Sequence, residues 1–211
     1  SDLILFFKGV AAAMKYNVSI EEFPVFPLAI QGPKADELAK RVWGDQVMDI
    51  RFFRHARVDV NGKPMLLARS GYSTQGGYEL YFEGETDGDL LWDQLMHTGG
   101  DLDIQAGSPC QSERVEAGLL SYLSDITPDM TPFEAGLGHF CEMGRDIGCL
   151  GWHALKAKQN PTRQIRPIEI HGDGLPPMQE FWQVTGIDGV PAGRVSSSCC
   201  AWSYDCNAAI G

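Results

Sequence analysis

A carboxylate and a phenol stand two residues apart, directly after a glycine-rich stretch, and together they could bind a flat heterocycle. Residues 69–81 read Arg-Ser-Gly-Tyr-Ser-Thr-Gln-Gly-Gly-Tyr-Glu-Leu-Tyr. The three glycines allow a tight turn and a close backbone approach to a planar ligand. In a strand over 78–82, alternation places Glu79 and Tyr81 on one face. The opposite face carries the remaining side chains, Tyr78, Leu80 and Phe82.

One carboxylate can accept hydrogen bonds from two neighbouring N–H groups of a planar ring, in a short, charge-assisted, bidentate arrangement. A hairpin loop that leaves Glu79 in solvent is the alternative interpretation of the same residues. Other catalytic arrangements receive no support, because the sequence shows no Ser/His/Asp or Cys/His constellation and no HExxH. The histidines stand at 55, 97, 139, 153 and 171, without ligand spacing. We therefore expect no metal site.

The elements that would position Glu79 form an α+β pattern. Apolar spacing and Ala11–Ala13 predict a helix over 3–16, and Pro33 and Gly44 bracket a second helix over 34–43. A further helix is expected over 87–97. The expected strands of this half are 18–22, 26–30, 52–60, 64–69 and 78–83. The strands over 52–60 and 64–69 are joined by Asn61-Gly62, a strong hairpin signal.

The second half is predicted to contain a long helix and then a β-rich end. Pro109 near its start predicts a helix over 108–123, on which Arg114 and Tyr122 would share a face. A surface salt bridge of Arg114 with a neighbouring glutamate is the alternative. A short helix is expected over 151–158, and strands over 165–171, 181–186 and 193–198. Pro161 marks the expected boundary between a domain over 1–160 and one over 163–211.

Composition excludes several classes of protein. A net charge of −11, without a block of lysine or arginine, argues against nucleic-acid binding. No run of about 18 apolar residues is present, so we expect no membrane span. The six cysteines lack a Cys-x-x-Cys pair, so we expect reduced thiols in a cytoplasmic protein, with neither a zinc site nor a disulfide framework.

Four stretches, in one order, resemble the folate-dependent aminomethyltransferase family, which includes the T protein of glycine cleavage and demethylating relatives. They are Leu-Ala-Ile-Gln-Gly-Pro at 28–33, Arg-Ser-Gly-Tyr at 69–72, Glu-Arg-Val-Glu-Ala-Gly-Leu-Leu-Ser-Tyr at 113–122 and Thr-Pro-Phe-Glu-Ala-Gly-Leu-Gly at 131–138. The resemblance covers nearly the whole chain. It implies a ferredoxin-like α+β folate-binding core followed by the start of a small β-barrel.

The resemblance also implies site residues. The family uses the Glu of a Gly-Tyr-Glu strand to hold the amine and ring N–H of pterin, and Glu79 matches that position. The other residues carried over as folate-binding are Tyr81, Tyr72, Arg114 and Tyr122. Gln31-Gly32-Pro33 matches too, but we interpret it as a turn that enters a helix. The catalytic aspartate of aminomethyl-transferring members would lie upstream of Ser1, so no catalytic residue is assigned.

The reaction that the resemblance implies is demethylation of dimethylsulfoniopropionate, with tetrahydrofolate as the methyl-accepting cosubstrate. The products would be 5-methyltetrahydrofolate and methylthiopropionate. A sulfonium methyl is already activated, because its leaving group departs as a neutral thioether. Catalysis would then be mostly alignment in a site that excludes water. The expected partner is a small sulfonium or methylated amine, and a homodimer is compatible with the sequence.

Two departures from the aminomethyl-transferring pattern favour a demethylase. Gly-Ser-Pro-Cys at 107–110 stands where those members tend to carry Ala-Arg-Asp, and 71–77 replaces their Gly-Tyr-Thr-Gly-Glu-Asp-Gly loop. Three alternatives remain: an aminomethyltransferase or O- or N-demethylase of the same family, a non-catalytic folate-binding module, and an α+β domain with a coincidental match. We also expect the chain to be a fragment that lacks N- and C-terminal portions.

Overall fold

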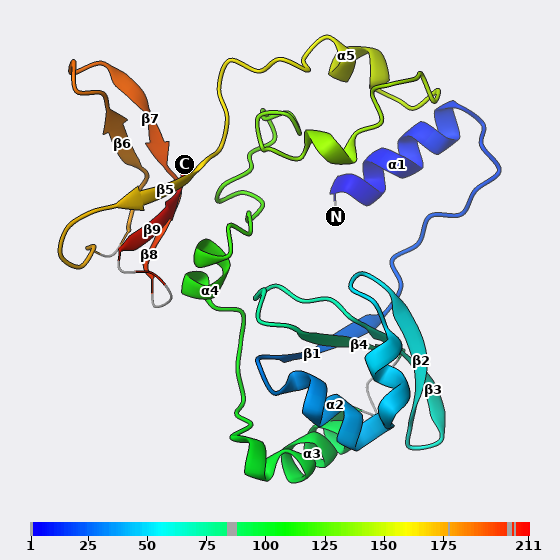
Figure 1. Cartoon of the computed structure of the whole chain (residues 1–211). Coiled ribbons are helices and arrows are strands. Elements are labelled where there is room, and N and C mark those ends of the chain that lie inside the picture. The colour runs from blue at the N-terminus through cyan, green and yellow to red at the C-terminus, as the bar shows by residue number, and fades with distance from the viewer. Residues whose placement is uncertain (1, 84–87, 177, 202–203, 205) are drawn as a thin grey trace. The chain divides into compact units, whose positions relative to one another are not determined.

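The computed structural model describes the 211 residues except 1, 84–87, 177, 202–203 and 205 (Figure 1). The chain forms two compact units, each described here by itself. The first contains residues 1–71 and 75–106, and the second contains 72–74 and 107–211. These units differ in extent from the expected domains, 1–160 and 163–211, which stay a prediction.

The first unit is built on a four-stranded antiparallel sheet with the order β1-β4-β3-β2. Strands β2, β3 and β4 follow one another as a meander, and β1 pairs with β4. Helices α2 and α3 lie on the same side of this sheet (Figure 1). The elements are α1 (Asp2–Ala13), β1 (Val25–Gln31), α2 (Ala35–Trp43), a 3-10 turn η1 (Asp45–Asp49), β2 (His55–Val60), β3 (Lys63–Ala68), β4 (Gly77–Glu83), α3 (Gly88–Thr98) and η2 (Gly100–Leu102).

The core of this unit lies between the sheet and the two helices, and it confirms the predicted alternation along β4. Tyr78, Leu80 and Phe82 are all buried, while Glu79 and Tyr81 face the other way and are half-buried. Apolar residues of both helices join the same cluster, among them Leu38, Ala39, Trp43, Leu91 and Leu95. Burial of one face of β4 therefore fixes the direction of Glu79 on the other face.

Most predicted elements of the first unit are confirmed. Asn61 and Gly62 have φ of 53° and 81° and form the two-residue turn between β2 and β3. The prediction of a strand over 18–22 was wrong, because the sheet ends at β1 and no strand pairs with those residues. The strand predicted from 52 begins at His55, since Arg54 N donates to Arg51 O in a turn.

The second unit contains short helices and two open antiparallel sheets. The sheets have the orders β5-β9-β8 and β6-β7, and the described residues form no closed barrel. Its elements are α4 (Gln111–Glu116), η3 (Gly138–Phe140), α5 (Trp152–Lys156), β5 (Pro167–Ile170), β6 (Trp182–Thr185), β7 (Pro191–Val195), β8 (Ser197–Cys200) and β9 (Asn207–Ile210). A small core joins α4 to β8 and β9 through Val115, Cys199 and Ile210. The chain is thus an α+β protein, as predicted, and its sheets are open.

The long helix predicted over 108–123 was wrong in extent. Helix α4 ends at Glu116 because Gly118 adopts φ of +66°, and its N–H donates to Val115 O at 3.0 Å. Leu119 N donates to Arg114 O at 2.8 Å, which completes a Schellman cap. Arg114 and Tyr122 therefore do not share a helix face. The strand expected over 193–198 is likewise divided, between β7 and β8.

Gly77 begins β4 where the backbone leaves no room for a side chain. A Cβ there would lie 2.2 Å from Ile30 O, at φ of +140°, whereas Gly76 has φ of +83° and nothing within 4 Å. We expect Gly77→Ala to lower the free energy of unfolding by about 3 kcal/mol or more, from strain and overpacking together. Gly76→Ala should cost only about 1–2 kcal/mol, from strain alone. Urea unfolding measures both, and equal losses would contradict the close approach.

Candidate functional site

Glu79 and Tyr81 meet on the outer face of β4. Tyr81 Oη donates a hydrogen bond to Glu79 Oε2 at 3.3 Å, and Ser70 Oγ donates to the same oxygen. Among the described residues, none donates a hydrogen bond to Glu79 Oε1. The carboxylate is therefore held through one oxygen, and the other remains for a ligand or for water.

The surroundings of Tyr81 favour its protonated form. Partial burial is the largest cause that raises the pKa of Tyr81. The negative charge of Glu79 and the hydrogen bond between Tyr81 and Glu79 raise this pKa further. Tyr81 therefore remains a hydrogen-bond donor at neutral pH, and its donation to Glu79 persists there.

The glycine-rich loop before β4 is tied at both ends to helix α2 through Asp36. Arg69 Nη2 contacts Asp36 Oδ2 at 2.8 Å, and Tyr78 Oη donates to Asp36 Oδ1 at 2.9 Å. Arg69 also lies over the Tyr78 ring, 5.6 Å from its centroid, and its Nη1 donates to Ile50 O at 3.2 Å. Burial above all, with Asp36 second, raises the pKa of Tyr78 to about 12. The residues that flank the loop are thus anchored to the folded core.

Gln31 crosses the base of the same loop, so our interpretation of 31–33 as only a helix-entry turn was incomplete. Its Nε2 donates to Ser70 O at 3.1 Å and to Tyr78 O at 3.3 Å. A Cβ on Gly71 would lie 1.9 Å from Gln31 Oε1, so a side chain there would displace the Gln31 amide. The match of the 28–33 stretch was the sequence signal for this role.

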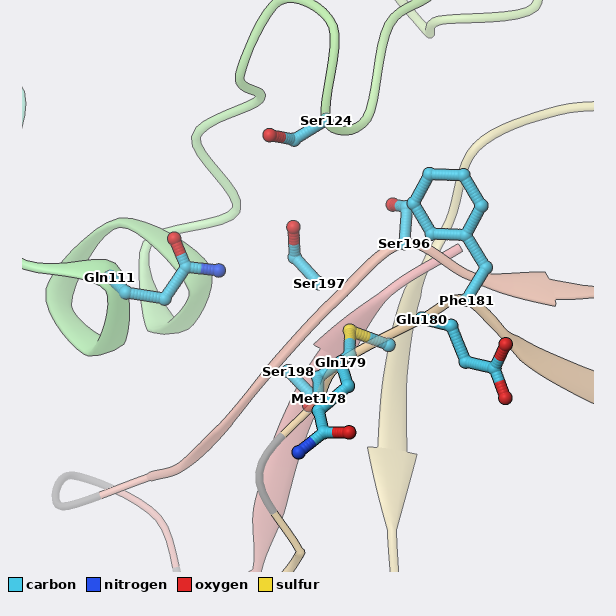
Figure 2. Close-up of a pocket in the computed structure, with 9 residues that line it drawn as sticks. All are labelled: Gln111, Ser124, Met178, Gln179, Glu180, Phe181, Ser196, Ser197 and Ser198. Atoms are coloured by element: carbon cyan, nitrogen blue, oxygen red, sulfur yellow. The ribbon is translucent and has the colours of Figure 1, made fainter.

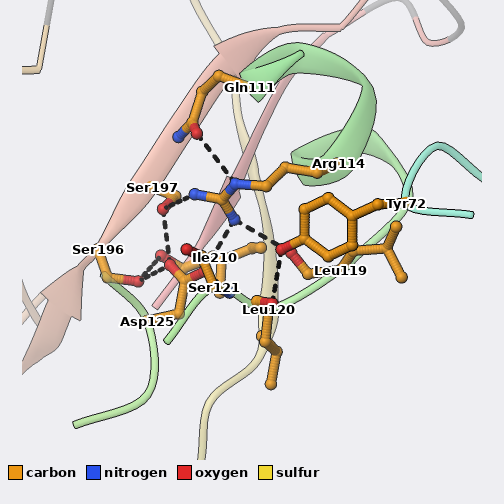
Figure 3. Close-up of polar contacts among 10 residues, drawn as sticks. All are labelled: Tyr72, Gln111, Arg114, Leu119, Leu120, Ser121, Asp125, Ser196, Ser197 and Ile210. Carbon is orange, nitrogen blue, oxygen red and sulfur yellow. Dashed lines mark hydrogen bonds and ion pairs between the residues drawn. The ribbon is translucent and has the colours of Figure 1, made fainter. Parts of the chain in front are cut away.

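Arg114 lies in the second unit, in a buried polar network (Figure 3). Its Nη1 contacts Asp125 Oδ2 at 2.8 Å and donates to Leu119 O at 3.0 Å. Its Nη2 donates to Ser197 Oγ at 2.7 Å, and its Nε donates to Gln111 Oε1 at 2.9 Å. The Arg114 side chain is 6% exposed and that of Asp125 is 0% exposed. Four hydrogen bonds thus commit this guanidinium to joining α4, the following loop and β8.

The carboxylate of Asp125 is equally committed. Oδ1 accepts from Ser196 Oγ and Ser197 Oγ, both at 2.6 Å, and Oδ2 accepts from Ser121 N at 2.8 Å. No spacing in the sequence pointed to this residue, because two of its partners, Ser196 and Ser197, lie more than 70 positions away along the chain. The network is complete without a ligand, and a folate contact of Arg114 stays a prediction.

The remaining predicted site residues, Tyr72 and Tyr122, also belong to the second unit. Tyr72 Oη donates to Leu120 O at 2.7 Å, in the loop that follows α4 (Figure 3). Tyr122 is 66% exposed and forms an isolated backbone bridge with Ile126. Glu79 and Tyr81 are therefore the predicted residues that the first unit brings together, and Tyr72, Arg114 and Tyr122 are predicted contributions of the second.

An open pocket of about 640 Å³ lies beside the Arg114 network (Figure 2). Its lining is mostly polar side chains with one methionine and one phenylalanine: Gln111, Ser124, Met178, Gln179, Glu180, Phe181, Ser196, Ser197 and Ser198. Ser196 and Ser197 hydrogen bond to Asp125, so this wall of the pocket is fixed by the buried network. None of the predicted folate-binding residues lines it.

The described residues contain no group of three or more His, Cys, Asp or Glu side chains placed to hold a metal ion. No disulfide joins the six cysteines, each of which lies within the described part of the chain. None of the described helices combines the length and apolar character needed to cross a membrane.

Comparison with known proteins identifies the family to which this fold belongs. The family model described as the GCVT N-terminal domain matches residues 7–145. A crystal structure of the glycine cleavage system aminomethyltransferase T from Bartonella henselae superposes with a TM-score of 0.76 at 21% identity, covering 97% of this chain and 57% of that one. The fold is therefore the one that this aminomethyltransferase adopts, and the chain belongs to the aminomethyltransferase (GCVT) family.

Curated relatives divide between two activities. Dimethylsulfoniopropionate demethylase DmdA from Ruegeria pomeroyi is 46% identical over 210 residues, which is 100% of this chain and 57% of that protein. An aminomethyltransferase from Bacillus mycoides is 33% identical over 175 residues, covering 79% of this chain and 46% of that protein. The chain thus spans about half the length of the relatives it matches. Members of this family use tetrahydrofolate as methyl acceptor or one-carbon carrier.

The pKa of Tyr81 reports on its contact with Glu79. We expect Glu79→Gln to lower this pKa, because a neutral amide removes the negative charge that disfavours the phenolate, while burial still keeps it above the ordinary value. Asp36→Asn should lower the pKa of Tyr78 from about 12 by the same reasoning and leave Tyr81 unchanged. NMR titration of ring-labelled tyrosine measures both. A Tyr81 pKa that does not respond to Glu79→Gln would contradict the contact.

The buried ion pair should dominate the stability of the second unit. We expect Asp125→Asn to lower the free energy of unfolding by about 3–5 kcal/mol, because it leaves the Arg114 guanidinium buried without its counter-charge. Asp129→Asn is the matched control: it removes an exposed carboxylate paired with Arg163, and the unfolding midpoint should barely change. Denaturant unfolding of both variants measures the difference, and similar losses would refute a structural role for Asp125.

Proposed function

We propose that this chain carries the pterin-binding part of a tetrahydrofolate-dependent methyltransferase that demethylates dimethylsulfoniopropionate. The observation that carries the proposal is the carboxylate of Glu79. It stands on the outer face of β4, directly after the glycine-rich loop, and is oriented by Ser70 and Tyr81. An outward carboxylate beside a phenol suits a flat ring that offers two adjacent N–H donors.

The fixed loop supports the same reading. Asp36 and Gln31 hold its two ends, so the backbone beside Glu79 is in place before any ligand arrives. A site that needs little rearrangement loses less free energy on binding. The residues of the first unit therefore fit a rigid, planar ligand such as pterin. Folate binding by Tyr72, Arg114 and Tyr122, which belong to the second unit, stays a prediction.

The choice of methyl donor rests on the relatives. Identity to the demethylase is 46% over the whole chain, against 33% over 79% of the chain for the aminomethyltransferase. The 71–77 and 107–110 stretches depart from the aminomethyl-transferring pattern in the same direction. Dimethylsulfoniopropionate is therefore the proposed substrate, and an aminomethyl donor is the second candidate, supported by the aminomethyltransferase matches.

The proposed reaction needs alignment more than acid–base chemistry. When bound, tetrahydrofolate supplies the N5 lone pair that accepts the methyl group. The carbon–sulfur bond of the sulfonium breaks, its electron pair returns to sulfur, and methylthiopropionate leaves as a thioether while the N5 proton passes to solvent. The part of this chain is to hold the pterin in one orientation through Glu79 and Tyr81, so that the approach to the methyl carbon is in line.

Titration calorimetry with tetrahydrofolate tests the proposal. We expect Glu79→Gln to weaken binding roughly tenfold or more, since hydrogen bonds to a charged group contribute about 1.5–3 kcal/mol. Asp93→Asn makes the same charge change at an exposed position of α3 and should leave the affinity unchanged. Unchanged affinity in Glu79→Gln would mean that the pterin is held elsewhere.

The substrate is tested in the same samples by adding dimethylsulfoniopropionate and measuring methylthiopropionate. Binding with turnover supports the demethylase. Binding without turnover supports a non-catalytic folate-binding role for this chain. Turnover of an aminomethyl donor in place of the sulfonium would support the second candidate.

A further inference from the structure

We infer that Ser70 is a positioning residue for Glu79: its hydroxyl fixes the orientation in which the carboxylate meets its ligand. This inference rests on the proposed folate site and adds to it a residue that does not itself contact the pterin. Ser70 Oγ donates to Glu79 Oε2, the oxygen that also accepts from Tyr81 at 3.3 Å.

Two donors on one oxygen leave the carboxylate little freedom to rotate. A glutamate on a strand face otherwise samples several rotamers, and binding has to select one of them. Here both donors act on Oε2, so the plane of the carboxylate is set and Oε1 is the oxygen left without a donor among the described residues. The arrangement organises one glutamate rotamer in advance of binding.

The position of Ser70 is itself determined by its neighbours. Gln31 Nε2 donates to Ser70 O, and the preceding residue, Arg69, is paired with Asp36. Gly71 follows, packed so closely against the Gln31 side chain that a Cβ would clash with it. The hydroxyl therefore projects from a backbone held on both sides, and it reaches Glu79 across nine positions of the chain.

A serine that merely satisfies a polar neighbour would look similar, so the test has to separate positioning from stability. The matched control is Ser19, whose Oγ donates to Glu21 Oε1 at 2.7 Å on the exposed surface. Ser19→Ala deletes the same kind of hydrogen bond away from the site. Ser70→Thr keeps the hydroxyl and Ser70→Ala removes it.

The experiment is a double-mutant cycle in this chain, read as the dissociation constant of tetrahydrofolate. We expect Ser70→Ala to weaken binding roughly 3- to 10-fold, below the direct loss from Glu79→Gln, because only the orientation is lost. Ser70→Thr should restore binding to within about twofold, and Ser19→Ala should leave it unchanged. In a Glu79→Gln background, Ser70→Ala should have no further effect, since the carboxylate that it orients is gone.

Two results overturn the inference while leaving the proposed site intact. One is that Glu79→Gln weakens binding and Ser70→Ala does not. The other is that Ser70→Ala weakens binding equally in both backgrounds, which would make its effect independent of Glu79. If Glu79→Gln itself leaves the affinity unchanged, the proposed folate site fails and the inference fails with it. Thermal unfolding of every variant excludes global destabilisation as the cause of a lost affinity.

Discussion

The contact of Asp36 with Arg69 and Tyr78 is the constraint on which the site in the first unit depends. One carboxylate on α2 holds Arg69, at the start of the glycine-rich loop, and Tyr78, the second residue of β4. The Asp36 side chain is 40% exposed, so the ion pair contributes modestly to stability. Its value lies in geometry, because it fixes both ends of a loop that its glycines would otherwise leave mobile. Gln31 also holds both ends of this loop, because its Nε2 donates to Ser70 O and to Tyr78 O.

The second unit uses a more costly interaction for a similar purpose. The pair of Arg114 and Asp125 is almost fully buried, and each partner loses its hydration. Serine hydroxyls and backbone groups satisfy the remaining donors and acceptors, so the network ties a short helix to β8 across a small apolar core. A helix of one and a half turns with so few apolar contacts needs such an anchor. This explains why an arginine matched to a family motif is committed to protein contacts here.

Sequence patterns predicted what depends on neighbours along the chain. Alternation along β4, the Asn61-Gly62 hairpin and the α2 and α3 helices follow from local periodicity and turn chemistry, and all are confirmed. The length of α4 was missed because Gly118 adopts a left-handed conformation that ends the helix. Ser70 lies only nine positions from Glu79, but the sequence pattern does not tell which loop side chain reaches the carboxylate. Asp125 was missed because two of its partners, Ser196 and Ser197, lie more than 70 positions away along the chain. The face of the strand on which each side chain lies was predictable from the sequence, but the hydrogen-bond partners of Ser70 and Asp125 were not.

We propose that Glu79, presented by an anchored loop and strand, receives the pterin of tetrahydrofolate. A crystal structure of this chain with tetrahydrofolate bound tests it most directly. We expect the exocyclic amine and a ring N–H of the pterin within hydrogen-bonding distance of the Glu79 carboxylate, with the Ser70 hydroxyl still on Oε2. A pterin bound away from β4, with Glu79 facing only solvent, would contradict it.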